Sequence, residues 1–160
     1  MHIRPARPDD AAAILAALRP VVAAGETYAL DPRMSDDELV AYWTAPDKHT
    51  FVAEEDGTLL GTYYIRTNQA GGGSHVCNCG YVTAEAATGR GVARLMCTDS
   101  LERARALGYE AMQFNFVVSS NVRAVGLWGA MGFETVGRLP GAFRHPALGA
   151  VDALVMYRTL

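Results

Sequence analysis

The strongest constraint on the fold of this chain is a repeated strand–helix unit in its second half. An apolar strand is predicted over residues 75–83, and a Gly-rich turn at residues 88–91 opens a helix that runs to Leu107. A second apolar strand over residues 110–118 leads into a helix over residues 121–131. Because a helix joins the two strands, the crossover should be right-handed and the strands should lie parallel in one sheet.

The remaining predicted elements complete a mixed α/β sheet. Apolar spacing and turn residues place strands at residues 2–6, 49–55, 59–66, 133–138 and 151–158, and helices at residues 9–24 and 35–44. Pro20 is expected to kink or end the first helix, and Asp56-Gly57 is expected to turn a hairpin. The chain is therefore predicted to form one domain over residues 1–160, an α+β mixed sheet of about seven strands with four helices on its two faces.

Composition and charge exclude several classes of protein. The chain has 160 residues, half of them hydrophobic, and is long enough to bury its own core. Its net charge of −3 and its lack of like-charge runs argue against nucleic-acid and membrane partners. With no signal peptide and no apolar stretch of bilayer length, a cytoplasmic protein is expected. Cys77, Cys79 and Cys97 have no further ligand at metal-binding spacing, which favours reduced thiols and no metal site.

The segment Thr-Gly-Arg-Gly-Val-Ala at residues 88–93 predicts an anion site at the start of a helix. Gly89 and Gly91 remove side chains where a phosphate would approach the backbone, and the first N–H groups of a helix have no intrahelical partner. Arg90 and Arg94 add positive charge. These features suit any diphosphate, although a dinucleotide site of the Rossmann type would place its turn after the first strand. A plain Gly-rich helix start is the structural alternative.

The second helix carries a longer pattern, Asn-x-x-Ala-x-x-Leu-Trp-x-x-x-Gly-Phe, over residues 121–133. Together with the preceding Gly-rich turn, it resembles the acyl-CoA site of the GCN5-related N-acetyltransferases (GNAT). The resemblance implies the GNAT fold and acetyl transfer from acetyl-CoA to an amine. It also implies that the fourth and fifth strands diverge at a bulge near the end of the fourth, so that the pantetheine chain enters the gap.

The same resemblance implies a set of residues that bind acetyl-CoA along the fourth strand and the two helix starts: Tyr81, Val82, Thr83, Gly89, Arg90, Gly91, Val92, Ala93, Arg94, Asn121 and Trp128. A backbone N–H near Val82 or Thr83 would stabilise the oxyanion that acyl transfer forms. Plain strand packing stays open for Tyr81 and Val82, and a helix N-cap stays open for Asn121.

Acid and base residues are not assigned by the sequence. Trp128 stands where many relatives have a tyrosine that protonates the leaving thiolate, and an indole cannot do so. Glu85 is expected in solvent, and His75 is either a base or a surface residue. This lack of an acid and a base also fits an alternative of another class, a sensor that binds acyl-CoA without turnover.

Asparagines within predicted strands indicate the acceptor site. Asn78 and Asn115 lie mid-strand among apolar residues, where asparagine is disfavoured and a buried amide needs partners. The stretches at residues 73–78, 114–117 and 139–146 resemble a GNAT subgroup, known from yeast, that acetylates proline analogues such as L-azetidine-2-carboxylate. In that subgroup the matching asparagines form the acceptor site.

The subgroup resemblance implies a small amino or imino acid as the acceptor. Asn78 and Asn115 would bind it, and Asn121 would contact acceptor or cofactor, which makes Asn115 and Asn121 the candidate catalytic residues. Tyr28 and Arg144, in loops after the first helix and between the last two strands, would cover the acceptor. A solvated turn stays open for Arg144. Other amines, such as a protein N-terminus, a polyamine or an antibiotic, are alternative acceptors, and a homodimer is common in the family.

Overall fold

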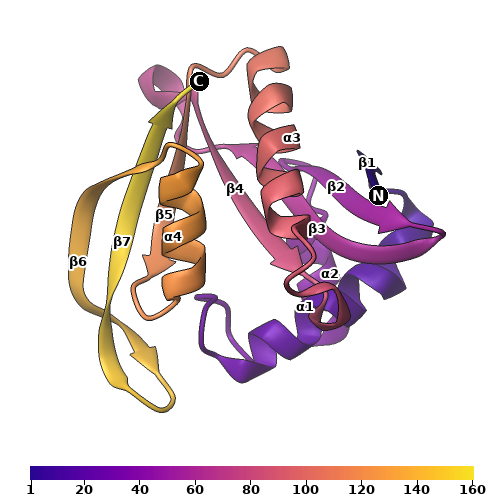
Figure 1. The fold of residues 1–160 in the computed structure, drawn as a ribbon, viewed down its shortest axis with the longest axis horizontal. Helices are drawn as coiled ribbons and strands as arrows, with labels where there is room; N and C mark the ends of the chain where they lie inside the picture. Colours follow the sequence, from indigo (N-terminus) through magenta and orange to yellow (C-terminus); the bar gives the residue numbers. More distant parts are fainter.

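A seven-stranded mixed sheet with helices on both faces forms the body of the molecule, seen in a computed structural model that describes residues 1–160 (Figure 1). The strands follow the order β1-β2-β3-β4-β5-β7-β6 across the sheet. They are β1 (His2–Pro5), β2 (His49–Glu55), β3 (Thr58–Thr67), β4 (Val76–Thr83), β5 (Ala111–Val118), β6 (Glu134–His145) and β7 (Gly149–Thr159). The helices are α1 (Ala11–Ala24), α2 (Asp36–Trp43), α3 (Val92–Ala106) and α4 (Val122–Ala130). The predicted fold class is confirmed.

The parallel step between β4 and β5 is short, and the two strands separate soon after it (Figure 1). They are in register only at Val76 with Ala111 and at Cys77 with Met112. The predicted splay is therefore confirmed, but its bulge was predicted in the wrong strand. The pairing of β4 with β3 is regular, whereas the pairing of β5 with β7 shifts register between Phe114 and Val117. A bulge bends the strand that carries it, so it is β5 that turns away.

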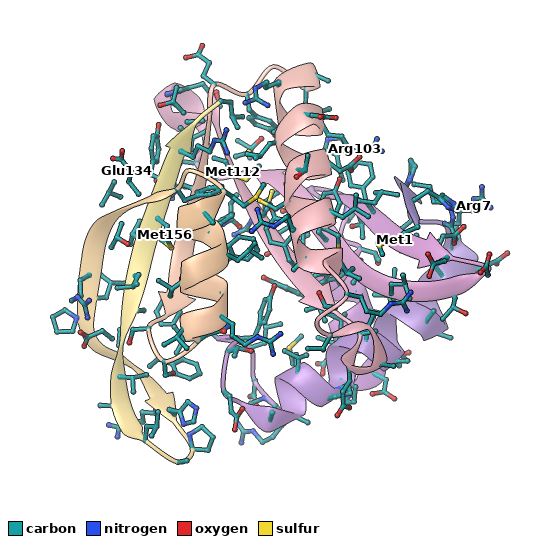
Figure 2. All side chains as sticks on the ribbon, viewed as in Figure 1. Met1, Arg7, Arg103, Met112, Glu134 and Met156 are labelled. Carbon is teal, nitrogen blue, oxygen red and sulfur yellow. The ribbon has the colours of Figure 1, made fainter.

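Two apolar clusters hold the helices to the sheet. On one face, α1 and α2 pack through residues such as Leu18 and Leu39, with Trp43 fully buried against the sheet. The indole N–H of Trp43 donates to the buried Thr62 hydroxyl at 3.0 Å, which satisfies both polar groups. On the other face, α3 and α4 cover a larger cluster in which Met112 is fully buried (Figure 2). None of the helices is long and apolar enough to cross a membrane.

One helix start differs from the sequence prediction. α3 begins at Val92 rather than at Gly89, because Gly89 and Gly91 adopt φ angles of 82° and 80°, outside the helical region. α1 continues through Pro20 to Ala24, the end predicted from the sequence, so Pro20 does not end the helix. The exposed Pro20 ring removes one N–H, but buried residues on both sides of it keep the helix packed against the sheet.

The last two strands are longer than predicted and form one extended hairpin, β6 with β7. A register shift between Leu139 and Phe143 takes in Pro140 and Gly141, beyond the predicted strand end at residue 138. Arg144 therefore lies within β6, opposite Ala150, and not in the predicted loop.

Candidate functional site

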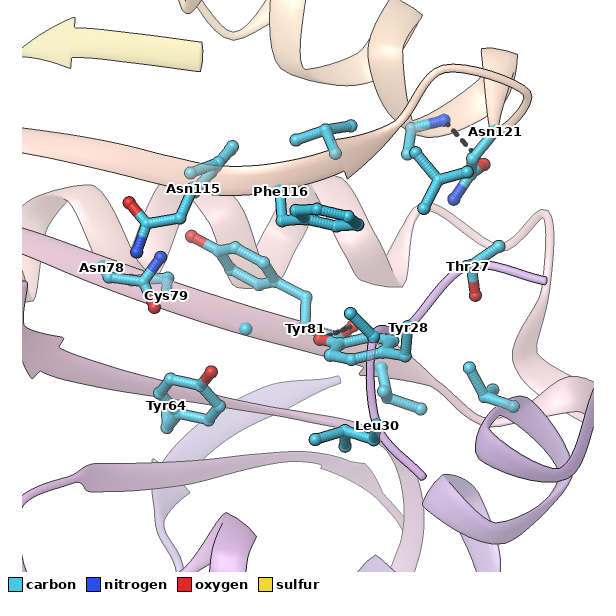
Figure 3. A pocket seen from close by; sticks show the side chains of 18 of the residues that line it. Thr27, Tyr28, Leu30, Tyr64, Asn78, Cys79, Tyr81, Asn115, Phe116 and Asn121 are labelled. Carbon is cyan, nitrogen blue, oxygen red and sulfur yellow. Dashed lines mark hydrogen bonds between the residues drawn. The ribbon is translucent and has the colours of Figure 1, made fainter. Parts of the chain in front are cut away.

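A cavity of about 380 Å³ lies where β4 and β5 separate (Figure 3). β3, β4, β5, the start of α4 and the loop after α1 all contribute to its walls. Most lining side chains are apolar, and the polar exceptions include Arg66, Asn78, Asn115 and Asn121. This volume and this lining are typical of a site for a small molecule or the reactive end of a larger one.

The edge of β4 that faces β5 presents free backbone groups to the gap. In the ladder with β3, the Asn68 N–H donates to the Val76 carbonyl at 2.9 Å, and the Ala84 N–H donates to the Leu60 carbonyl at 2.9 Å. Because an antiparallel ladder uses alternate residues, the Val82 N–H points to β3. The N–H groups of Tyr81 and Thr83 point to the gap.

That alternation corrects one expectation about the oxyanion donor. The Val82 N–H lies in the ladder with β3, so it cannot donate a hydrogen bond to the oxyanion in the gap. The Val82 side chain does line the cavity, as do those of Tyr81 and Thr83. Thr83 remains the candidate donor, and Tyr81 joins it.

The loop after α1 closes one side of the cavity, as expected, and Tyr28 anchors it. The Tyr28 hydroxyl donates to the Tyr81 carbonyl at 3.0 Å (Figure 3). This carbonyl is one of the backbone groups on the free edge of β4. Its ring packs edge-on against Trp43, with centroids 6.0 Å apart. Burial raises the pKa of the Tyr28 phenol above its ordinary value, so it stays protonated and can donate this bond.

The structure brings two of the three predicted asparagines together. Asn78 and Asn115 lie side by side at one end of the cavity, whereas Asn121 lies at the other end (Figure 3). The Asn78 amide donates to the Gln113 carbonyl at 2.9 Å and so joins β4 to β5 just beyond their last paired residues. The Asn115 amide donates to Asn68 Oδ1 at 2.7 Å, and Asn115 Oδ1 accepts from Gln113 Nε2 at 2.8 Å.

Asn121 is the N-cap of α4. Its Oδ1 accepts from the Ala124 N–H at 3.3 Å, which confirms the capping role left open by the sequence. Its amide group also lines the cavity.

Aromatic side chains and a buried thiol complete the wall beneath the gap. Trp128, 8% exposed, packs against Tyr81 and Phe114 with centroid separations of 5.0 Å to each. Cys79 lines the cavity, and burial raises its pKa well above the ordinary value of a thiol. Since the thiolate is the reactive form, Cys79 is unsuited to act as a nucleophile here.

The Gly-rich turn at the start of α3 has the geometry predicted for an anion site. The first hydrogen-bonded N–H in the helix belongs to Leu95, which donates to the Gly91 carbonyl at 3.0 Å. The N–H groups of residues 91–94 have no hydrogen-bond partner. A Cβ atom on Gly89 or Gly91 would meet nothing within 4 Å, so the turn is open on its outer side. Unpaired N–H groups at a helix start bind anions.

The two arginines of this turn are placed differently. Arg90 forms an ion pair with Glu55, at the end of β2, so its charge is partly neutralised. Arg94 reaches across to α4, with Nη1 3.6 Å from Met131 Sδ. Arg94 thus spans the space between the two helices, whereas Arg90 points to the β2–β3 hairpin.

Other sequence candidates lie outside the cavity, and several residues that line it were not predicted. Arg144 is exposed on β6 and does not line the cavity, and His75 and Glu85 are exposed. No carboxylate or imidazole lines the cavity. Tyr42, Tyr64 and Arg66 do line it. The alternation of β3, which places Tyr64 and Arg66 on the face covered by α1 and α2, was the signal that could have found two of them.

Three comparisons with known proteins agree on one family. A model described as the acetyltransferase (GNAT) family matches residues 16–133. The N-acetyltransferase aca1 of Schizosaccharomyces pombe is 28% identical over 148 residues, which cover 82% of this chain and 71% of that protein.

Solved structures extend the comparison. A GCN5-related N-acetyltransferase from Kribbella flavida is 42% identical and superposes with a TM-score of 0.94, covering 99% of this chain and 97% of that one. A phosphinothricin acetyltransferase from Sinorhizobium meliloti, solved in complex with acetyl-CoA, shares the fold with a TM-score of 0.87 at 20% identity. That match covers 99% of this chain and 88% of the other.

Proposed function

Because this chain belongs to the GNAT acetyltransferase family, and is an N-acetyltransferase that uses acetyl-CoA, we propose that its acceptor is a small amino or imino acid, such as the proline analogue L-azetidine-2-carboxylate. The observation that carries the proposal is the pair of carboxamides, Asn78 and Asn115, at one end of a cavity of about 380 Å³. A cavity of this size suits a compact acceptor.

Acetyl-CoA fits the residues that flank this cavity. The unpaired N–H groups at residues 91–94 suit its pyrophosphate, since a helix start favours negative charge. Of the free N–H groups of Tyr81 and Thr83, one suits a carbonyl of its pantetheine chain and the other suits the thioester oxygen, and Trp128 offers an apolar wall beside them. We therefore assign the cofactor to the gap between β4 and β5, with its reactive end in the cavity.

The cavity residues act on the acceptor by position and by hydrogen bonding. When bound, acetyl-CoA would supply a thioester: the amine attacks its carbonyl carbon, the carbon–sulfur bond breaks, and CoA leaves as a thiolate while the proton lost by the nitrogen goes to this thiolate or to water. The Thr83 or Tyr81 N–H donates to the carbonyl oxygen as it gains negative charge. Asn78 and Asn115 hold the acceptor so that its nitrogen faces this carbon. Because no carboxylate or imidazole lines the cavity, the amine must arrive neutral, after its proton has gone to water.

Substitution of Asn115 by alanine tests the acceptor assignment. Asn115→Ala should lower kcat/KM for L-azetidine-2-carboxylate by about tenfold or more, since one oriented polar contact is worth about 1–2 kcal/mol. Acetyl-CoA binding, measured by calorimetry, should survive. Gln69→Ala is the matched control, because Gln69 is an exposed carboxamide on the same loop as Asn68. Unchanged turnover in Asn115→Ala would refute its role.

A panel of amines, assayed by release of free thiol, tests the choice of acceptor. Proline analogues and amino acids should be acetylated faster than polyamines, peptides with a free N-terminus or aminoglycosides. A clear preference for any of the latter would reassign the acceptor and leave the acetyl-transfer chemistry unchanged.

A further inference from the structure

Arg66 contributes the only charged side chain to the cavity wall. It lies near the end of β3, on the face that α1 and α2 cover, two residues beyond Tyr64. An apolar cavity with one fixed positive charge attracts a small anion more strongly than a neutral or cationic ligand.

The guanidinium of Arg66 is poorly satisfied by the protein itself. Its Nε is buried and has no hydrogen-bond partner, and it is the one buried side-chain nitrogen or oxygen of which this is true. The nearest carboxylate is that of Asp47, whose Oδ2 lies 4.0 Å from Arg66 Nη1 and whose side chain is 61% exposed. A buried donor without a partner is costly, and an incoming oxygen that accepts from it removes that cost.

Arg66 also stands beside a free hydrogen-bond acceptor. Arg66 and Asn78 are directly opposite each other in the β3–β4 register, so their side chains are neighbours on one face of the sheet. Asn78 uses its amide nitrogen to reach the Gln113 carbonyl, while its Oδ1 makes no hydrogen bond. One end of the cavity therefore offers a cationic donor next to a neutral acceptor.

We propose that Arg66 binds the carboxylate of the acceptor while Asn78 Oδ1 accepts from its amine, so that the enzyme selects amino or imino acids over amines that lack a carboxylate. This inference rests on the proposed function and names the residue that sets its specificity. A guanidinium matches a carboxylate with two parallel N–H donors, which gives direction as well as attraction.

The test compares an imino acid with its uncharged methyl ester. Arg66→Met keeps an unbranched side chain about as long as the aliphatic part of arginine and removes the charge. It should raise the KM for L-azetidine-2-carboxylate by about tenfold to a hundredfold, because a charge-assisted hydrogen bond is lost. The KM values for the methyl ester and for acetyl-CoA should stay within about twofold of the wild-type values. Comparing each substrate between variants cancels the difference in amine basicity.

Two further variants serve as controls in this test. Arg66→Lys restores the charge without the paired donors, so its KM for the imino acid should fall between those of the wild type and Arg66→Met. Arg105→Met, which removes an exposed arginine on α3, should change none of these constants. If Arg66→Met does not fold, as judged by thermal unfolding, Arg66→Lys carries the comparison. Equal losses for acid and ester, or no loss for either, would overturn the proposal.

A binding measurement separates this inference from the proposed function. L-azetidine-2-carboxylate is titrated calorimetrically into the wild type and Arg66→Met in the presence of CoA. If the wild type acetylates no imino acid but binds the probe through Arg66, the proposed acceptor chemistry fails and the carboxylate site stands. If the imino acid is acetylated but Arg66→Met binds it normally, the proposed function stands and the role of Arg66 is wrong. Absence of both turnover and binding overturns both.

Discussion

At the scale of single residues, burial keeps two phenols and one thiol of the cavity uncharged across the neutral range. Burial raises the pKa of Tyr28, Tyr64 and Cys79, so each stays protonated and uncharged well above neutral pH. None of these three groups should therefore gain or lose a proton between about pH 6 and pH 9.

The pH dependence of the rate should accordingly follow the acceptor and not the enzyme. Below the pKa of the acceptor, its neutral fraction rises about tenfold per pH unit, so kcat/KM should rise with a slope near one and level off at that pKa. The measurement is a pH–rate profile for two acceptors whose amines differ in basicity. A break at the same pH for both would contradict this and would indicate a general base that the cavity residues do not supply.

Some residues of the cavity could be predicted from the sequence and others could not, because the sequence indicates the surroundings of a side chain only in some cases. Asn78 and Asn115 were predictable because a carboxamide inside an apolar strand needs a polar partner. Arg66 was missed because the predicted strand ended on it, and an arginine at a strand end is normally exposed. The structure shows that it lines the cavity, opposite Asn78 in the β3–β4 register.

At the scale of elements, the start of α3 should be the part that acetyl-CoA binding depends on most. Gly91 has a φ of 80°, and Gly108, just beyond the other end of the helix, has a φ of 88°. A Cβ atom at either position would meet nothing within 4 Å, so alanine introduces backbone strain without a clash at both. Each substitution should lower the free energy of unfolding by about 1–2 kcal/mol.

The two glycine variants should differ in their effect on the cofactor. Gly91→Ala should raise the Kd for acetyl-CoA by about tenfold, since it distorts the turn and places a methyl group where the pyrophosphate would approach. Gly108→Ala should leave that Kd unchanged. Calorimetry with acetyl-CoA, together with thermal unfolding, makes the comparison. Equal Kd values for the two variants would show that the anion does not bind at this turn.

The order of the elements was predictable, but several of their ends and irregularities were not. The apolar patterns predicted seven strands and four helices in the correct order, because each pattern reflects which face is buried. Pro20 lies within α1 and Pro140 within β6, since a proline removes one hydrogen bond while packing over many residues determines whether the element continues. The bulge in β5 has no local sequence signal.

At the scale of the whole molecule, the sheet consists of two antiparallel parts joined by a short parallel contact. β1 to β4 form one antiparallel part, and β5, β7 and β6 form the other. The strand pairing between them has two register positions, and the bond from Asn78 to the Gln113 carbonyl lies just beyond these. Because α3 joins β4 to β5, the sequence predicted that these two strands would be parallel neighbours. The splay itself was implied only by the family resemblance, because divergence of two strands leaves their apolar patterns unchanged.

Acetyl-CoA in the gap should protect the free edge of β4 against hydrogen exchange in an alternating pattern. The N–H groups of Gly80 and Val82 lie in the ladder with β3 and should exchange slowly with or without the cofactor. Those of Tyr81 and Thr83 face the gap, so they should exchange faster in the free protein and slow by about tenfold or more when acetyl-CoA binds. Residue-resolved exchange measured by NMR distinguishes these positions. Uniform slowing along β4 would mean general stabilisation, and no slowing at Tyr81 and Thr83 would mean that the cofactor does not pair with this edge.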